Sequence, residues 1–225
     1  MILINKSTEP KSWKKYRKTP GVKYQSSHDL VDSLLKEQGY ICAYCMRKVP
    51  CRDKLYEKDG TTYVLTQEDH RVEHILSREK HSDWELDYSN MVLCCPGHIG
   101  ADEHCDRLKG DNDISFSPTD PMFISTIKYK ATGEIISSND QWNTEINNLL
   151  NLNTDLLVKN RASALSSVIA LINRECKGRV WNLKMLNKYL DKYKNKHRGE
   201  DGELRYKQFC GIVVYYMNKK LKQIE

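Results

Sequence analysis

The sequence predicts an α+β fold, in which a small core of two strands and a helix precedes a mainly helical second half. Three observations support this. Six of the eight cysteines lie before residue 106. Two β-prone runs flank an Asp59-Gly60 turn signal in the first half. From Trp142 onward, apolar residues recur at helical spacing. A chain of 225 residues can bury one sizeable core or two small ones.

The first half is expected to open with a helix over residues 26–39, which have a Ser-x-x-Asp start, a one-sided apolar pattern and a final glycine. A hairpin follows over residues 53–65, and we expect its second strand to continue through residues 71–75. Residues 84–95 predict a loop and a short apolar segment, and residues 105–110 predict a helical turn. The local order is therefore strand, strand, helix.

The second half is expected to follow a linker over residues 111–121, which are rich in turn-forming residues. Residues 123–137 predict one more hairpin. A long helical stretch then starts near Trp142 and breaks near Asn153. Two further helices are expected over residues 181–193 and 204–221, with a strand as the alternative for the very apolar centre of the last.

Charge divides the chain into basic ends and an acidic middle. Residues 1–24 hold seven Lys or Arg against one acidic residue (+6), residues 25–176 sixteen against twenty-four (−8), and residues 177–225 thirteen against five (+8). Basic ends suit a polyanion and an acidic middle suits divalent cations, although a lysine-rich stretch can equally be a solvated helix face. The candidate nucleic-acid-binding residues are Lys14, Lys15, Arg17 and Lys18.

No run of about 18 apolar residues occurs, so no membrane partner is expected. The apolar start, residues 1–5, is too short for a secretory signal, and the protein is expected to be cytoplasmic. Clustered cysteines in such a chain favour metal binding over disulfides. We divide the chain into a basic segment (1–24), a cysteine-containing core (25–121) and a mainly helical region (122–225).

The cysteines predict a structural zinc site made of Cys42, Cys45, Cys95 and Cys105. The first two form a CxxC pair, whose spacing lets both thiolates reach one tetrahedral ion, whereas nine residues separate the second two. Cys94, His98, His104 and Cys51 are alternative ligands. Alternatively, a cysteine can be a small buried thiol of the hydrophobic core, and this interpretation suits Cys94, Cys176 and Cys210 best. A closed four-thiolate site has no open position, so any chemistry must lie elsewhere.

Between the two cysteine pairs, Glu73-His74 is followed sixteen residues later by Asn90, a layout suited to phosphodiester hydrolysis. The cation would be Mg²⁺ or Mn²⁺, held by carboxylate oxygens of Glu73 and Asp106. His74 is the candidate general base, because a neutral imidazole can accept a proton near pH 7. Asn90 would hold the intervening loop, and Lys109 would stabilise the phosphate.

A second acid-histidine pair, Asp69-His70, lies four residues upstream. We favour Glu73-His74, because the apolar Ile75 follows it directly and Asn90 then lies at the usual interval. The other histidines, His28, His81 and His197, are expected at the surface.

These motifs together resemble the zinc-containing form of the HNH (ββα-metal) endonuclease family: CAYC, VEHI, SNMVLCC and CDRLKG. The resemblance implies that Glu73 and His74 are the acid-histidine pair, that Asn90 is the middle residue and that Asp106, in a position that is Asn or His in many members, is the second metal ligand.

A wider resemblance covers almost the whole chain. It rests on PKSWKKY, EQGYICAYC, LNLNTDLLVKNR and YKQFCGIVVYYMNKKL, which are similar to the PtuB nuclease family of Septu-type anti-phage systems, including retron-associated members. The resemblance implies a bacterial defence complex with a PtuA-like ATPase, which cuts nucleic acid, in our expectation double-stranded DNA. It also implies that residues 122–225 dock the partner. The alternatives are a free-standing restriction-like HNH enzyme and a non-catalytic zinc-binding scaffold that binds nucleic acid.

Overall fold

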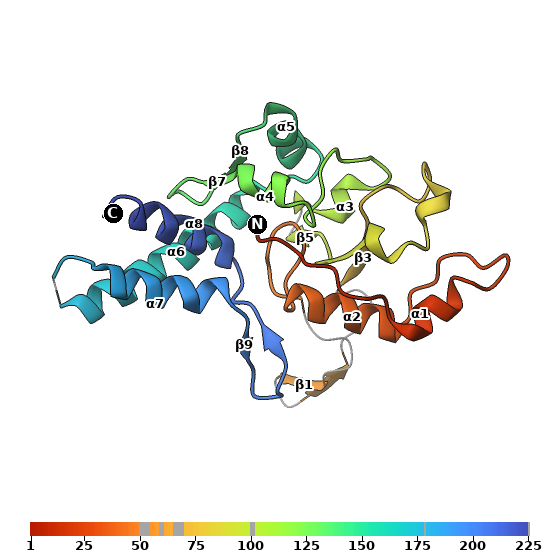
Figure 1. The fold of residues 1–225 in the computed structure, drawn as a ribbon, viewed down its shortest axis with the longest axis horizontal. Helices are drawn as coiled ribbons and strands as arrows, with labels where there is room; N and C mark the ends of the chain where they lie inside the picture. Colours follow the sequence, from red (N-terminus) through yellow and green to blue (C-terminus); the bar gives the residue numbers. More distant parts are fainter. Residues whose placement is uncertain (50–54, 59–60, 65–69, 100–101, 178, 225) are drawn as a thin grey trace.

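The computed structural model describes residues 1–49, 55–58, 61–64, 70–99, 102–177 and 179–224 (Figure 1). It has an α+β fold, in which the strands of these residues form two-stranded antiparallel sheets. In Figure 1 the helices of the second half lie together on one side, and the first two helices of the chain lie on the other. Within the described ranges, no helix is both long and apolar enough to cross a membrane.

Two helices belong to the N-terminal part, α1 (Lys11–Tyr16) and α2 (His28–Gln38). α2 begins after Ser27, whose hydroxyl accepts a hydrogen bond from the backbone N–H of Leu30. It ends at Gly39, whose left-handed backbone (φ 59°) is easily adopted only by glycine. The predicted helix over residues 26–39 is therefore present and ends at the expected glycine, but Ser27 rather than Ser26 caps its start.

The strands of the first half pair differently from the expectation. β1 (Leu55–Lys58) and β2 (Thr61–Val64) form the predicted hairpin, whose Asp59-Gly60 turn lies outside the described residues. β3 (Arg71–His74) was expected to extend β2, and this was wrong, because it belongs to another sheet. It pairs with β4 (Met91–Cys94), a fully buried apolar strand that gives β3 a partner in the core.

The rest of the first half consists of short elements beside the β3–β4 pair. Two 3-10 turns, η2 (Ser82–Trp84) and η3 (Tyr88–Asn90), lie in the loop between β3 and β4. β5 (His98–Ile99) and β6 (Asp102–Glu103) form a small hairpin, and α3 (Asp106–Lys109) follows it directly. The antiparallel pair β3–β4 thus precedes the short helix α3, with the β5–β6 hairpin between them.

In the second half, a helix replaces the first part of the expected strand. Asp120 accepts a hydrogen bond from the N–H of Met122, and Pro121 occupies the first helical position, so α4 (Pro121–Thr126) forms before β7 (Ile127–Tyr129) and β8 (Ile135–Ser137). The expected long helical stretch is α5 (Asp140–Asn148) and α6 (Asp155–Cys176), with the break near Asn153 as predicted.

The last part of the chain contains α7 (Leu183–Lys194), the hairpin of β9 (His197–Arg198) and β10 (Leu204–Arg205), and α8 (Cys210–Leu221). The helix expected over residues 204–221 is therefore shorter, and its apolar centre is helical rather than a strand. The hairpin was not predicted, because each of its strands is only two residues long and carries no alternating pattern.

The two halves share one hydrophobic core, which includes residues from Met1 to Met217. Backbone hydrogen bonds join them: the N–H of Cys105 donates to Leu150, that of Phe209 to Met46, and that of Tyr206 to Gly39, at 2.8–3.0 Å. The proposed boundary near residue 121 thus separates regions that are packed against each other.

Gly39 offers a test of this packing. A Cβ at Gly39 would lie 2.6 Å from the Tyr206 ring, whereas a Cβ at Gly21, which also has a positive φ, would meet nothing within 4 Å. We expect Gly21→Ala to cost about 1–2 kcal/mol of backbone strain and Gly39→Ala clearly more. Thermal unfolding of both variants measures this, and equal decreases in stability would show that the Tyr206 contact contributes little.

Candidate metal centre and acid-histidine site

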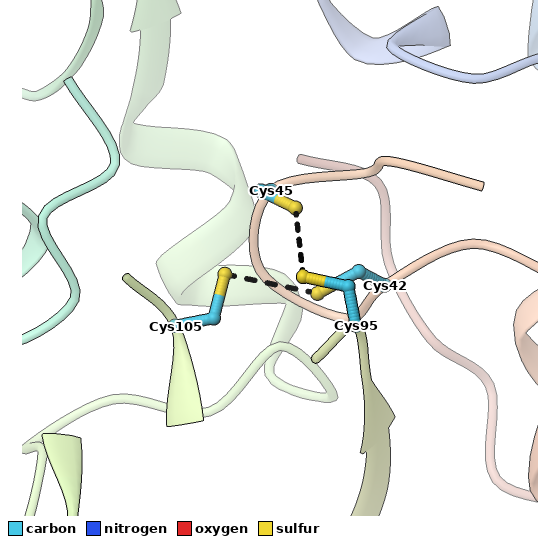
Figure 2. Close-up of side chains that lie close together, drawn as sticks. All are labelled: Cys42, Cys45, Cys95 and Cys105. Carbon is cyan, nitrogen blue, oxygen red and sulfur yellow. Dashed lines mark hydrogen bonds between the residues drawn. The ribbon is translucent and has the colours of Figure 1, made fainter. Parts of the chain in front are cut away.

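Four buried cysteines converge between the two halves, and they are the four predicted from the sequence: Cys42, Cys45, Cys95 and Cys105. Their sulfur atoms all lie within 4.8 Å of one another. Figure 2 shows the four side chains pointing toward one another. The Sγ atoms of Cys42 and Cys105 are 3.8 Å apart, and those of Cys45 and Cys95 are 3.7 Å apart. This cluster could hold a metal ion such as zinc.

The sulfur spacing distinguishes a metal site from a disulfide. Disulfide sulfurs are about 2.0 Å apart, whereas four thiolates around a tetrahedral zinc, each with a Zn–S bond of about 2.3 Å, are about 3.8 Å apart. The separations of Cys42 from Cys105 and of Cys45 from Cys95 agree with the tetrahedral value. The side chains are thus arranged around a common centre rather than in covalent pairs.

The first two cysteines lie in a tight turn after α2. The N–H of Cys42 donates to the carbonyl of Arg47, and that of Met46 donates to the carbonyl of Cys42. The buried amide of Gln38 fixes this turn to β4, because it donates to the carbonyls of Ile41 and Leu93 and accepts from the N–H of Leu93. The sequence alone did not indicate this role for Gln38.

The second two cysteines are brought together by the β5–β6 hairpin. His98 pairs with Glu103, and the N–H of His104 donates to the carbonyl of Gly97, so the chain turns back on itself between Cys95 and Cys105. Nine residues separate these two cysteines, unlike the two of a CxxC pair, and they were expected to bulge out. They contain this hairpin, of which residues 100–101 are not described.

The alternative ligands take other places. Cys94 is buried on β4, outside the four-sulfur cluster, and burial raises the pKa of its thiol, which favours the protonated form. His98 is exposed. The Nδ1 atom of His104 lies 3.1 Å from the sulfur of Cys105, so this imidazole adjoins the cluster from outside. Cys51 lies outside the described residues. Cys176 and Cys210 are buried elsewhere, as expected of core thiols.

The carboxylate of Glu73 is buried next to the cysteine cluster. It accepts a hydrogen bond from the Tyr44 hydroxyl at 2.8 Å, and it lies 3.0 Å from the ammonium of Lys109. Burial and the adjacent carboxyl of Asp106 raise the pKa of Glu73, and the charge of Lys109 opposes this. Two oxygen-donor side chains, Glu73 and Asp106, thus lie near each other at this site.

His74, the next residue on β3, is buried and neutral near pH 7. Burial lowers its pKa to about 4. Its Nε2 lies 3.0 Å from the backbone carbonyl of Glu85. Because a carbonyl can only accept, this nitrogen carries the proton, and Nδ1 keeps its lone pair. The Tyr24 ring packs edge-on against the imidazole, with ring centres 4.6 Å apart. The arrangement leaves one basic nitrogen in an oriented imidazole.

Asn90 holds both ends of the loop that follows β3. Its side-chain oxygen accepts from the N–H of Leu76 at 2.8 Å, and its side-chain nitrogen donates to the carbonyls of Leu76 and Trp84. The loop therefore keeps the Glu85 carbonyl close to His74. In the competing pair, His70 is buried, and Asp69 lies outside the described residues.

Lys109 is almost fully buried, with a side chain that is 1% exposed. Its ammonium donates to the backbone carbonyl of His74 at 3.0 Å in addition to its ion pair with Glu73. The expected contact of Lys109 with phosphate stays a prediction, and in this structure the ammonium ties α3 to the end of β3. Asp106 forms an ion pair with Arg71, which was not among the predicted site residues.

The basic N-terminal segment lies against the loop that orients His74. The buried Trp13 of α1 donates from its indole N–H to the Leu86 carbonyl at 3.2 Å. Of the four candidate nucleic-acid-binding residues, Lys14, Lys15 and Lys18 are exposed, and Arg17 pairs with Glu9 through two hydrogen bonds.

Sequence reasoning missed Arg71, Tyr44 and Tyr24 as neighbours of the site. Arg71 is two residues before Glu73 on the same strand, and side chains two apart share a face, so the strand period could have indicated it. Tyr44 lies between the two cysteines of the CxxC turn, and no spacing rule connects it to Glu73.

Compared with known proteins, the chain matches no family model and no curated protein.

Proposed function

We propose that this protein is a metal-dependent endonuclease of the HNH type, which hydrolyses phosphodiester bonds of DNA as the nuclease subunit of a Septu-type defence complex. One observation carries the proposal. An acidic residue and a neutral, oriented histidine at the end of β3 lie beside a second carboxylate at the start of α3, with the intervening loop fixed by Asn90. This strand-strand-helix arrangement next to a four-cysteine site suits a ββα-metal centre.

Glu73 and Asp106 are the residues that would hold a Mg²⁺ or Mn²⁺ ion. Their carboxylates fit a hard divalent cation, because both are oxygen donors and the two side chains lie near each other. The ion, when bound, would neutralise charge that develops on the scissile phosphate and its leaving oxygen. Lys109 and Tyr44 hold the Glu73 carboxylate in place from the buried side.

His74 acts as the general base in this proposal. Its protonated Nε2 donates to the Glu85 carbonyl, and its Nδ1 lone pair accepts a proton from the attacking water. Burial lowers its pKa to about 4, which keeps the imidazole neutral at physiological pH. Structural zinc in the four-cysteine site has a separate role, because its four thiolates leave no position for substrate.

In this proposal, the second half of the chain, residues 122–225, docks the ATPase partner. A groove near the end of α8 is lined by apolar side chains from three segments, including Ile169, Trp181 and Tyr216. Val180 and Ile224, which also line it, are 90% and 44% exposed. Exposed apolar side chains in one place are typical of protein interfaces, which supports docking there.

The proposed function is tested with zinc-loaded, full-length protein and its cognate ATPase. Cleavage of supercoiled plasmid is measured in Mg²⁺, Mn²⁺ or chelator, with and without the ATPase, and an RNA of equal length serves as the second substrate. We expect DNA cleavage that requires the divalent cation and is efficient only with the ATPase. Cleavage that persists in chelator, or none in any mixture, would contradict the proposal.

The exposed lysines of the N-terminal segment should bind backbone phosphates. For duplex DNA, each lysine–phosphate pair contributes about 0.9 to the slope of log affinity against log salt concentration. Replacing Lys14, Lys15 and Lys18 by alanine should therefore reduce the slope by up to about 2.7. Equilibrium binding of a labelled duplex at several salt concentrations measures this.

A charge-matched control comes from three exposed lysines outside this segment, Lys159, Lys219 and Lys222. Replacing these by alanine removes the same formal charge. If the slope falls equally in both triple variants, the effect is one of net charge, and the N-terminal segment is not a specific phosphate-binding surface.

A further inference from the structure

Two ion pairs adjoin each other at the acid-histidine site, with the two acidic side chains in the middle and one cationic side chain at each end. Arg71 donates from Nε to Asp106, and Glu73 pairs with Lys109 at 3.0 Å. The two acidic side chains are close enough for Asp106 to raise the pKa of Glu73. The formal charges of the four cancel. Each of the two carboxylates that would bind the divalent cation therefore already has a cationic partner.

The two cationic side chains differ in their freedom to move. Lys109 is 1% exposed and is also bonded to the His74 carbonyl, so its withdrawal would leave Glu73 as a buried, unpaired charge. The Arg71 side chain is 51% exposed, at the first position of β3, and its long stem can turn toward solvent without disturbing the core. Arg71 is therefore the partner that can be displaced.

A divalent cation would meet strong repulsion from Arg71 in its present position. With all four side chains in place, binding would raise the local charge from zero to +2, and the guanidinium would compete for the same Asp106 oxygens. Withdrawal of Arg71 both lowers this charge and frees a ligand oxygen. The guanidinium then needs another anion, and a phosphate of the nucleic acid matches its planar set of donors.

We propose that Arg71 is a gate of the metal site, which competes with the divalent cation for Asp106 until a backbone phosphate of the substrate draws the guanidinium away. Metal binding and nucleic-acid binding are thereby coupled, because each favours the outward position of Arg71. The inference rests on the proposed function, since it takes Glu73 and Asp106 as the ligands. It assigns Arg71 a regulatory role rather than a catalytic one.

The test is calorimetric titration of zinc-loaded, full-length protein with Mn²⁺ in the absence of nucleic acid. We expect Arg71→Gln to bind Mn²⁺ at least about tenfold more tightly than the unmodified protein. Arg71→Lys, which keeps the charge on a single-point donor, should lie between the two. Zinc content and thermal unfolding establish that each variant is folded.

Arg78 provides a matched control. Its guanidinium is exposed and lies over the Tyr24 ring, 4.8 Å from the ring centre, close to the site but on a different partner. Arg78→Gln removes the same charge and should change Mn²⁺ affinity less than about twofold. If Arg71→Gln and Arg78→Gln increase the Mn²⁺ affinity equally, the effect comes from the loss of any nearby positive charge. That result would overturn the proposal.

A second arm measures the coupling. Repeating the titration with a short duplex of non-cleavable linkages, after subtraction of Mn²⁺ binding to the duplex alone, should show tighter Mn²⁺ binding in the unmodified protein and a smaller gain in Arg71→Gln. Equal gains, or an Arg71→Gln affinity no tighter than that of the unmodified protein, would overturn the gate but leave the nuclease proposal intact. If Mn²⁺ binds neither protein, with or without duplex, the metal-dependent function itself fails.

Discussion

Replacing His74 by alanine should reduce DNA cleavage by roughly 10²- to 10⁴-fold, the usual contribution of a positioned general base. Zinc content and thermal stability should change little, because His74 is not a member of the cysteine cluster and its imidazole hydrogen-bonds, among the described residues, to the backbone carbonyl of Glu85. Single-turnover cleavage at saturating Mn²⁺, with the ATPase present, measures the effect on chemistry alone.

Two other histidines serve as controls for this variant. The Nε2 atom of His81 lies 3.0 Å from a carboxylate oxygen of Asp113, and His81 is not a residue of the proposed site. His81→Ala should therefore cleave DNA at close to the normal rate. His70→Ala tests the competing acid-histidine pair and should also be mild in its effect on chemistry. If His70→Ala abolishes cleavage and His74→Ala does not, Asp69-His70 is the true pair.

Replacing Cys42 or Cys105 by serine should remove the zinc and, with it, the folded state. Apparent zinc-binding free energies in four-ligand sites are about 10–16 kcal/mol, as large as the whole stability of a typical domain of about 5–15 kcal/mol. The cluster also lies at the junction of the two halves, where the backbone N–H of Cys105 donates a hydrogen bond to the carbonyl of Leu150. Elemental analysis should find about one zinc per chain in the unmodified protein and none in the variants, which should aggregate.

Cys94→Ser and Cys210→Ser are the matched controls, because both thiols are buried but lie outside the cluster. Each should keep its zinc, although a buried hydroxyl costs some stability. Zinc that is retained in Cys105→Ser and absent from Cys94→Ser would show that Cys94 is the ligand.

Local signals predicted those parts of the fold that local chemistry determines. The Ser27 cap and Gly39 define α2 from within the sequence, and the CxxC spacing indicates the turn after it. The pairing of β3 with β4 depends instead on residues about twenty positions apart, so the expected continuation from β2 was wrong. α4 is a different case, because its signal is local: the cap formed by Asp120 outweighs the β-prone residues that follow, and this balance was misjudged from the sequence.

The candidate site shows the same division. Motif spacing indicated Glu73, His74 and Asn90, and the cysteine pattern indicated all four members of the sulfur cluster. Spacing carries no information on which charges neutralise one another once the chain is folded. The burial of Lys109 against Glu73 and the pairing of Arg71 with Asp106 therefore became visible only in three dimensions.

The most direct test of the claim that Glu73 and Asp106 hold the catalytic cation is the Mn²⁺ dependence of the cleavage rate in Asp106→Asn. This variant keeps the size of the side chain and removes one negative ligand. We predict that the Mn²⁺ concentration for half-maximal cleavage rises at least about tenfold, the equivalent of about 1.4 kcal/mol, while zinc content is unchanged. An unchanged half-maximal concentration would contradict the assignment of Asp106 and, with it, the proposed centre.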